Sequence, residues 1–176
     1  MNSFYEKNFS FLDKKIFLTI LIVFFSFFLR LIFLYFSDGF TRPVIEDSAD
    51  YHNHALNIIY EGEHYVFNQE GNKIFSSRPP LLSYVLSVAY LFPFDNKVLI
   101  GRILQIIFSS FTVFLSFLVS RKFGLNLKVS FLAMFIICCY PPSIFYSSRI
   151  LTENLSAMLL LLSMLFFLDY FSKKNI

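Results

Sequence analysis

The sequence predicts an all-α integral membrane protein with about four transmembrane helices, and three observations support this fold class. Hydrophobic residues make up 56% of the 176 residues, with 26 Phe among them, whereas charged residues make up only 15%. Mean hydropathy is positive, at +0.62. Several apolar runs approach the roughly 20 residues that a helix needs to cross a bilayer. Soluble, disordered and nucleic-acid-binding chains carry more charge, so the lipid bilayer, and not a nucleic acid, is the expected partner.

The first apolar run follows a basic N-terminal segment, residues 1–15. The lysines of this segment favour a cytoplasmic location. Residues 16–36 are long enough to cross the bilayer and are predicted to form the first transmembrane helix. Arg30 interrupts this run. Because a charge in lipid is costly, we expect Arg30 to face a helix bundle or to reach toward the outer interface.

A polar segment, residues 37–97, comes next and concentrates ionisable side chains. Residues 37–80 hold seven acidic residues against three basic ones, together with all three histidines of the chain. Apolar residues at spacings of three and four predict a helix over residues 47–61. Asp47 or Ser48 is the expected N-cap of this helix.

The rest of the polar segment contains a stop, a turn and a second helix. Gly62 is typical of the end of a helix, and residues 70–73 indicate a turn between two short extended pieces. Residues 79–93 are apolar but short for a span, which favours an interfacial helix lying along the bilayer. Pro79 and Pro80 suit the first turn of that helix.

Three further apolar segments complete the chain. Residues 98–120, 129–146 and 150–171 are predicted as transmembrane helices, and residues 172–176 as a cytoplasmic tail. Prolines 141 and 142 break or end the third of the four predicted spans, residues 129–146, since proline cannot donate the helical hydrogen bond.

Basic clusters decide between two topologies. Five basic residues follow the second and fourth predicted spans, namely Arg121, Lys122, Lys128, Lys173 and Lys174. If residues 79–93 crossed the membrane, both clusters would lie outside, against the positive-inside rule. If these residues lie in the interface, both clusters lie inside. The second topology is therefore expected, with residues 37–97 on the outer face.

The acidic start of the helix over residues 47–61 is the first candidate site. Glu46, Asp47 and Asp50 place three carboxylates there. A carboxylate at this position could act as a general base or hold a divalent cation. The alternative is structural: Asp47 caps the helix, and the other two carboxylates favour its positive end.

The histidines of the same helix are a second candidate. Asp50 and His54 share a helix face at a spacing of four and could form part of a metal site, although zinc needs three or four ligands. The alternative is that His52 and His54 are exposed loop histidines.

Two charged positions outside this helix are also candidates. Arg78 has a planar fork of donors that suits a phosphate, or it could simply contact lipid headgroups. Glu153 lies near the start of an apolar run and is therefore a functional candidate. The alternative is an intrahelical ion pair with Arg149, four residues earlier.

The order of these motifs along the chain is distinctive. They are Asp47-x-x-x-Tyr51-x-x-x-Ala55, Glu61-Gly62, Arg78-Pro79-Pro80-Leu81, Arg102-Ile103-Leu104-Gln105, Arg121-Lys122-Phe123-Gly124 and Leu151-Thr152-Glu153. This order resembles the N-terminal part of the GT-C class of membrane glycosyltransferases, in particular the bacterial branch similar to protein O-mannosyltransferases and the lipid A aminoarabinose transferase. The resemblance covers nearly all of residues 16–171.

The resemblance implies an activity and a location. These enzymes transfer a hexose or pentose, with inversion, from a polyprenyl-phosphate donor to a lipid, glycan or protein hydroxyl. They act on the outer face of a bacterial inner membrane, which agrees with a cytoplasmic N-terminus. The sugar and the acceptor are not implied.

The resemblance also implies roles for individual residues. Asp47 would be the catalytic base, and Arg78 would lie near the donor phosphate, with Arg149 as a second phosphate contact. Glu153 stands at a second acidic site, which in some relatives helps to hold a divalent metal with the residue at the Asp47 position. Tyr51 and His54 would line the substrate site. Many relatives have Asp-Glu where this chain has Asp47-Ser48, a departure that bears on metal use.

Two other interpretations stay open. A non-catalytic membrane protein, such as a transporter or accessory subunit, would use Arg30, Arg102 and Glu153 as polar contacts inside the membrane. An inactive truncated fragment is the other, because GT-C enzymes have further spans beyond the part that this chain resembles.

Overall fold

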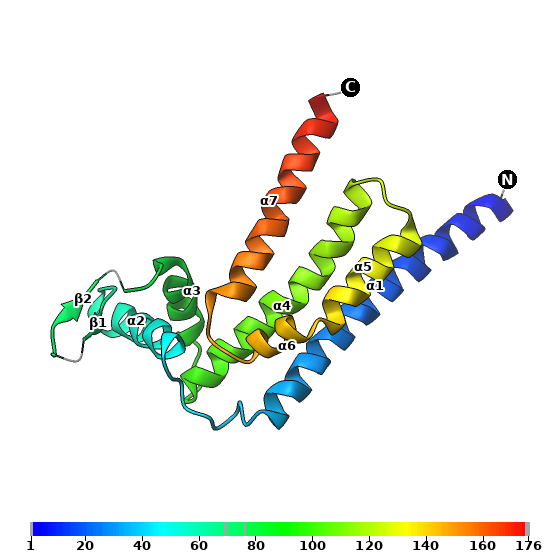
Figure 1. Ribbon diagram of the computed structural model, residues 1–176. Helices are drawn as coiled ribbons and strands as arrows, with labels where there is room; N and C mark the ends of the chain where they lie inside the picture. Colours follow the sequence, from blue (N-terminus) through cyan, green and yellow to red (C-terminus); the bar gives the residue numbers. More distant parts are fainter. Residues whose placement is uncertain (1, 69, 76, 175–176) are drawn as a thin grey trace.

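The computed structural model describes residues 2–68, 70–75 and 77–174, with side chains from residue 14 to residue 173 of these ranges. The chain is mostly helical, at 74%. The elements follow in the order α1 (Asn2–Phe36), α2 (Asp47–Glu61), β1 (Val66–Phe67), β2 (Lys73–Ile74), α3 (Pro80–Tyr90), α4 (Lys97–Lys122), α5 (Leu127–Cys139), α6 (Pro141–Ser147) and α7 (Thr152–Lys174) (Figure 1).

Three helices are long and apolar enough to cross a membrane. They comprise Lys14–Phe36 of α1, all of α4, and Thr152–Lys173 of α7. Helices α5 and α6 pass the same test together, but they are bent by 51° and so count as a fourth span only if the pair is one broken span. The predicted class, a helical membrane protein, is thus supported with three to four candidate spans.

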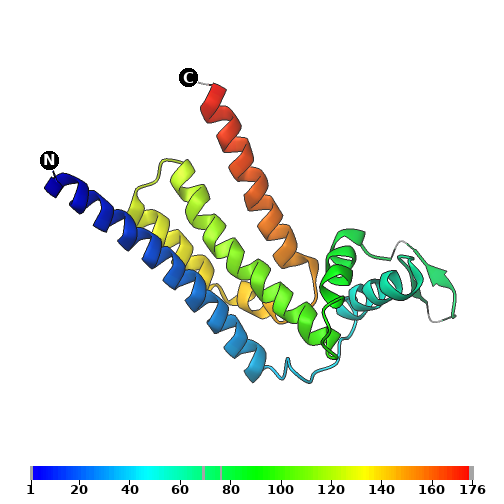
Figure 2. The ribbon, with the colours of Figure 1, turned by 180° about the vertical axis from the view of Figure 1, so that it is seen from behind.

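Helix α4 is the centre of the helix group, because α1, α3, α5, α6 and α7 all pack against it. Both ribbon views place the two termini and the α4–α5 connection at one end of the group (Figures 1 and 2). Helices α2 and α3 and the small hairpin lie beyond the opposite end, which we call the loop end. Every residue proposed above for catalysis or binding belongs to a segment at the loop end.

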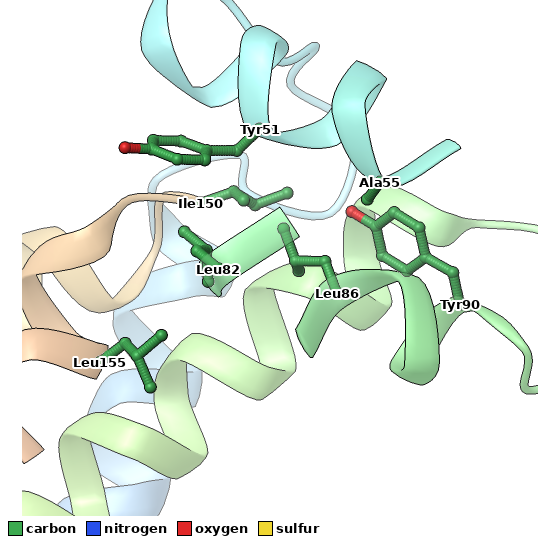
Figure 3. Close-up of a cluster of buried hydrophobic side chains, with 7 residues drawn as sticks. All are labelled: Tyr51, Ala55, Leu82, Leu86, Tyr90, Ile150 and Leu155. Atoms are coloured by element: carbon green, nitrogen blue, oxygen red, sulfur yellow. The ribbon is translucent and has the colours of Figure 1, made fainter. Parts of the chain in front are cut away.

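Helix α2 lies against α3 and the start of α7 through one apolar cluster (Figure 3). Its buried members are Tyr51, Ala55, Leu82, Leu86, Tyr90, Ile150 and Leu155. Tyr51 and Ala55 are four residues apart, so the predicted apolar face of the helix is confirmed. Because burying one large apolar side chain contributes about 1.5–3 kcal/mol, this cluster anchors the loop-end elements to the spans.

Of the two helix ends predicted for α2, only the C-terminal one is confirmed. Gly62 adopts a left-handed backbone with φ of 75°, and its N–H donates to the carbonyl of Ile58 at 3.2 Å, so the predicted stop is confirmed. The predicted cap is wrong. Glu46 occupies the N-cap position at φ of 50° and makes no side-chain capping bond, and Asp47 is already inside the helix. Asp47 is therefore free to face another element.

The turn predicted over residues 70–73 is present as well. Strands β1 and β2 pair antiparallel on either side of it, with Val66 opposite Ile74. Gly71 adopts a positive φ of 81°, which glycine tolerates without strain. Within the described residues, this hairpin is the single exception to an all-helical fold.

Arg30 faces the helix bundle, one of its two expected positions. Its side chain is completely buried. The Nε donates to the Oγ of Ser109 at 2.7 Å, and Nη2 donates to the Oγ of Ser143 at 3.1 Å. Within the described part of the chain, Arg30 forms no ion pair. Neutral acceptors from α4 and α6 therefore satisfy this charge inside a candidate span.

The break between α5 and α6 explains two further bonds of Arg30. Pro141 and Pro142 have no N–H, so the carbonyls of Ile137 and Cys138 lose the donors that a continuous helix would supply. Arg30 donates to both carbonyls, at 3.5 and 3.2 Å. A buried carbonyl without a donor is destabilising, and Arg30 therefore holds the broken helix together.

Candidate functional site

Arg78 joins two carboxylates of α2 at the loop end. Its Nε donates to Oδ2 of Asp50 at 3.0 Å, and its Nη2 donates to Oδ1 of Asp47. Asp47 and Asp50 lie three residues apart in the first turn of α2, and Arg78 precedes α3. We call Asp47, Asp50 and Arg78 the charged cluster. The structure thus brings together the expected base and the expected phosphate ligand, which are 31 residues apart in the chain.

Asp50 was expected as one of three carboxylates at the start of this helix and as a metal partner of His54, not as a partner of Arg78. Its spacing of three from Asp47 was the available signal that one cation could hold both, because residues three apart share a helix face. The side chains of the charged cluster are a third to a half exposed, from 31% for Arg78 to 53% for Asp47. A substrate could therefore reach the cluster from the loop end.

Tyr51 links the charged cluster to α7. Burial raises the pKa of its phenol, while a hydrogen bond with Thr152 and the charge of Arg78 oppose that rise. The negative charge of Glu153, the residue after Thr152, also raises the pKa of this phenol. Figure 3 shows the ring of Tyr51 over Ile150, with its hydroxyl directed away from Tyr90. A neutral phenol here can orient a substrate oxygen.

His54 is buried and not exposed, so the interpretation as an exposed loop histidine is wrong for this residue. Its side chain is fully covered, because it packs under the segment that connects β2 to α3. Its Nε2 lies 2.8 Å from the Oγ of Ser77, and its ring stacks on His64 with centroids 3.9 Å apart. Burial and the neighbouring His64 lower the pKa of His54 to about 4. His54 is therefore neutral near pH 7.

Neutral His54 predicts a loss of stability in acid. Between pH 6.5 and 4 the unfolded chain binds a proton at this site that the folded chain does not. The free energy of unfolding should thus fall as the pH drops through that window, by up to about 3 kcal/mol. Unfolding of the detergent-solubilised wild type and of His54→Gln should be compared at pH 7 and pH 4.5. The variant should lose less stability than the wild type, and equal losses would contradict the assignment.

Arg149 does not pair with Glu153. Helix α7 begins at Thr152, so Arg149 precedes it, and the two residues do not share a helix face. No ion pair joins them among the described side chains. The expected alternative of an intrahelical pair is therefore wrong. The guanidinium of Arg149 instead lies over the ring of Phe145, 4.5 Å from its centroid.

Arg149, an expected phosphate contact, lies in a second basic site whose other arginines sequence reasoning did not group with it. A cavity of about 50 Å³ lies between the α1–α2 connection, the first turns of α2 and α4, and the α6–α7 connection. Three arginines line it together with Pro43, Val44, Ile45 and Ser48, and these arginines are Arg42, Arg102 and Arg149. We call it the arginine pocket. The signal in the sequence was Arg102, a charge inside an apolar span.

The structure adds no metal centre to these sites. No group of three or more His, Cys, Asp or Glu that could hold a metal ion is found among the described residues. Asp50 and Asp47 are both engaged by Arg78. A cation held by Asp47 and Glu153 would need water or substrate oxygens to complete its shell, as magnesium sites often do.

Comparison with known proteins adds no relative: no protein-family model, curated protein or solved structure matches this chain. A functional proposal therefore rests on the motifs and on the geometry of the loop end.

Proposed function

We propose that this protein is a glycosyltransferase that moves a sugar from a polyprenyl-phosphate donor to a hydroxyl group. The observation that carries the proposal is the charged cluster, in which Asp47 and Arg78 meet at the loop end of the candidate spans. The carboxylate of Asp47 would serve as the base, and the neighbouring guanidinium of Arg78 would bind the phosphate. A prenyl phosphate in the bilayer would present its phosphate and sugar at the same level, where the apolar helices end.

The proposed reaction assigns one step to each residue. Asp47 accepts the proton of the acceptor hydroxyl, whose oxygen attacks the anomeric carbon of the sugar. The bond from that carbon to the phosphate oxygen breaks, and the prenyl phosphate leaves with the electron pair. Arg78 stabilises the charge that develops on the leaving phosphate. Attack from the face opposite the leaving group inverts the anomeric configuration.

The ion pairs of Arg78 suggest how substrate prepares the base. In this structure Arg78 is shared between Asp47 and Asp50. A donor phosphate offers Arg78 stronger, bidentate acceptors, so its arrival would draw the guanidinium away from Asp47. Asp50, bonded to Nε, would keep Arg78 attached to α2. Asp47 would then have a free oxygen for the acceptor hydroxyl.

The proposal includes a topology. The last turn of α4, the first turn of α5 and the C-terminal end of α7 carry five basic residues at the end opposite the charged cluster, namely Arg121, Lys122, Lys128, Lys173 and Lys174. By the positive-inside rule that end faces the cytoplasm of a bacterial inner membrane, together with the N-terminus. The charged cluster then faces outward, where prenyl-phosphate sugars are used in enzymes that this chain resembles.

Replacing Asp47 with Asn tests the proposal directly. The variant keeps the size of the side chain but cannot take a proton, so transfer should fall about 10²- to 10⁴-fold. The full chain in liposomes should be assayed with a panel of prenyl-phosphate hexoses and pentoses, and acceptor glycosylation measured. Asp50→Asn is the matched control, because it removes the other carboxylate of Arg78 and should lower transfer far less.

Two outcomes would decide against this function. If the wild type transfers no sugar from any donor of the panel, the result favours the interpretation as a non-catalytic membrane protein. If Asp47→Asn and Asp50→Asn reduce transfer equally, Asp47 is not the base, and the cluster acts only through its charge.

A further inference from the structure

The arginine pocket concentrates positive charge without an internal counter-charge. Arg42, Arg102 and Arg149 line one cavity, and none of them forms an ion pair within the described residues. The nearby acids Asp47 and Asp50 are held by Arg78 instead. Three like charges around one small cavity repel one another, and an anion inside it would remove that repulsion.

Arg102 makes this a built site and not a chance group of surface residues. It is only 3% exposed, although it lies in the first turns of a candidate span. Its Nη1 donates to the carbonyl of Gly39 at 2.6 Å, and its Nη2 donates to that of Pro43 at 3.5 Å. These bonds fix its guanidinium against the α1–α2 connection. Its Nε, however, is buried and has no hydrogen-bond partner.

Arg149 also has a hydrogen-bond donor without an acceptor. Its Nε is also buried without a partner, and the ring of Phe145 supports its guanidinium from one side. Buried guanidinium N–H groups without acceptors are rare, because each one forfeits the hydrogen bond that it made in water. Two such groups on arginines of one cavity therefore indicate an absent acceptor with several oxygens.

Arg42 supplies a third, adjustable donor. It lies in the α1–α2 connection, is partly buried, and its side chain makes no hydrogen bond or ion pair to another described residue. The cavity holds about 50 Å³, against the 10–15 Å³ that one water needs on the same measure. It therefore admits a group of a few oxygen atoms but not a nucleotide or a sugar.

We propose that the arginine pocket binds a phosphate group. The guanidinium fork matches phosphate oxygens in pairs, and the cavity lies at the loop end, beside the first turns of the candidate span α4. The group can belong to a lipid headgroup or be free phosphate, since the chemistry of recognition is the same. This inference goes beyond sugar transfer, because it needs neither Asp47 nor a glycosyl donor.

Binding should be measured on the full chain with two probes. The first is inorganic phosphate, added to detergent-solubilised protein at constant ionic strength while the unfolding temperature is followed. The second is phosphatidic acid in phosphatidylcholine nanodiscs, with lipid retention read by native mass spectrometry. Protection by inorganic phosphate would assign the pocket to the free ion as well. Retention of phosphatidic acid alone would assign it to a lipid headgroup, and either result supports the site.

Variants of the pocket give the decisive comparison. Arg42→Gln and Arg149→Gln each remove one charged donor, which should weaken binding about 10- to 100-fold. Arg42→Gln breaks no bond within the described chain, so its folding should be unaffected. Arg121→Gln, the same change at the opposite end of α4, is the control and should bind like the wild type. Equal binding by wild type and Arg42→Gln, or binding of neither probe, would overturn the proposal.

Asp47→Asn separates this inference from the proposed function. It should lower sugar transfer about 10²- to 10⁴-fold and leave phosphate binding intact. Phosphate binding by a wild-type protein that transfers no sugar from any donor would reject the proposed function alone. Transfer that persists while neither probe binds would reject the arginine pocket alone.

Discussion

Arg30→Leu should weaken the assembly of the helices by about 3 kcal/mol. In the assembled protein Arg30 donates to the carbonyls of Ile137 and Cys138 and to the hydroxyls of Ser109 and Ser143. All of these acceptors are at or near the break between α5 and α6. With Leu in its place, the carbonyl of Cys138 would lose the donor that Arg30 supplies, and the carbonyl of Ile137 would keep only the N–H of Tyr140, at 3.4 Å.

The charge of Arg30 also raises the free energy of the separated state, in which α1 lies in the bilayer without its partner helices. A separate α1 helix in lipid would expose Arg30 to hydrocarbon, which is costly, whereas assembly supplies acceptors from other helices for every arm of the guanidinium. Leu removes the penalty of the separated helix as well as the bonds of the assembled one. Both effects act in the same direction and reduce the free energy of assembly.

Unfolding in mixed detergent–SDS micelles measures this effect. Arg30→Leu should unfold at a clearly lower SDS fraction than the wild type. Ser143→Ala is the matched control, since it removes one hydroxyl acceptor of Arg30 and leaves the carbonyl bonds, and it should cost about 1 kcal/mol or less. An Arg30→Leu variant as resistant to SDS as the wild type would show that the broken helix does not depend on this arginine.

Gly101→Val should be the second severe change, with a loss of about 3 kcal/mol in the free energy of unfolding. A Cβ at Gly101 would lie 2.7 Å from Cδ1 of Ile150 and 2.9 Å from the hydroxyl of Tyr90. Both neighbours are buried, and the Tyr90 hydroxyl is also bonded to Nδ1 of His52 at 2.9 Å. Gly101 lies where α4 meets α3 and the α6–α7 connection. A larger side chain would push these elements apart and weaken the packing of the loop end.

A graded series tests the steric cause. Gly101→Ala should destabilise less than Gly101→Val, because it adds one carbon and gains up to about 1 kcal/mol of helix propensity. Ile150→Val deletes the nearest atom, Cδ1, and should cost about 1 kcal/mol alone. Combined with Gly101→Ala it should restore part of the lost stability. Strictly additive losses in the double variant would argue against this contact.

Features that depend on near neighbours in the chain were predictable. The spacing of Tyr51 and Ala55 indicated the buried face of α2, and Gly62 indicated its end. The turn at Gly71 and the break at Pro141 followed from the backbone limits of glycine and proline. In each case the physical cause acts within a few residues, so the sequence contains it directly.

Features that depend on packing were not predictable. His54 looked like an exposed residue of a polar segment, but the connection to α3 covers it and Ser77 bonds to it. Arg149 and Glu153 had the spacing of a helical ion pair, yet the helix begins between them. Asp47 looked like a cap, yet the cap position falls on Glu46 and Asp47 faces Arg78.

The amino-acid sequence by itself determined a helical membrane protein, the approximate places of its candidate spans, and the concentration of ionisable residues between the first two of them. The tertiary structure alone decided the partner of each charge. Arg30 donates hydrogen bonds to carbonyls of a broken helix, Arg78 forms ion pairs with two carboxylates, and Arg102 lines a pocket with two other arginines. Apolar runs and helical periods are local quantities, whereas the acceptor of a buried charge comes from whichever distant element packs against it.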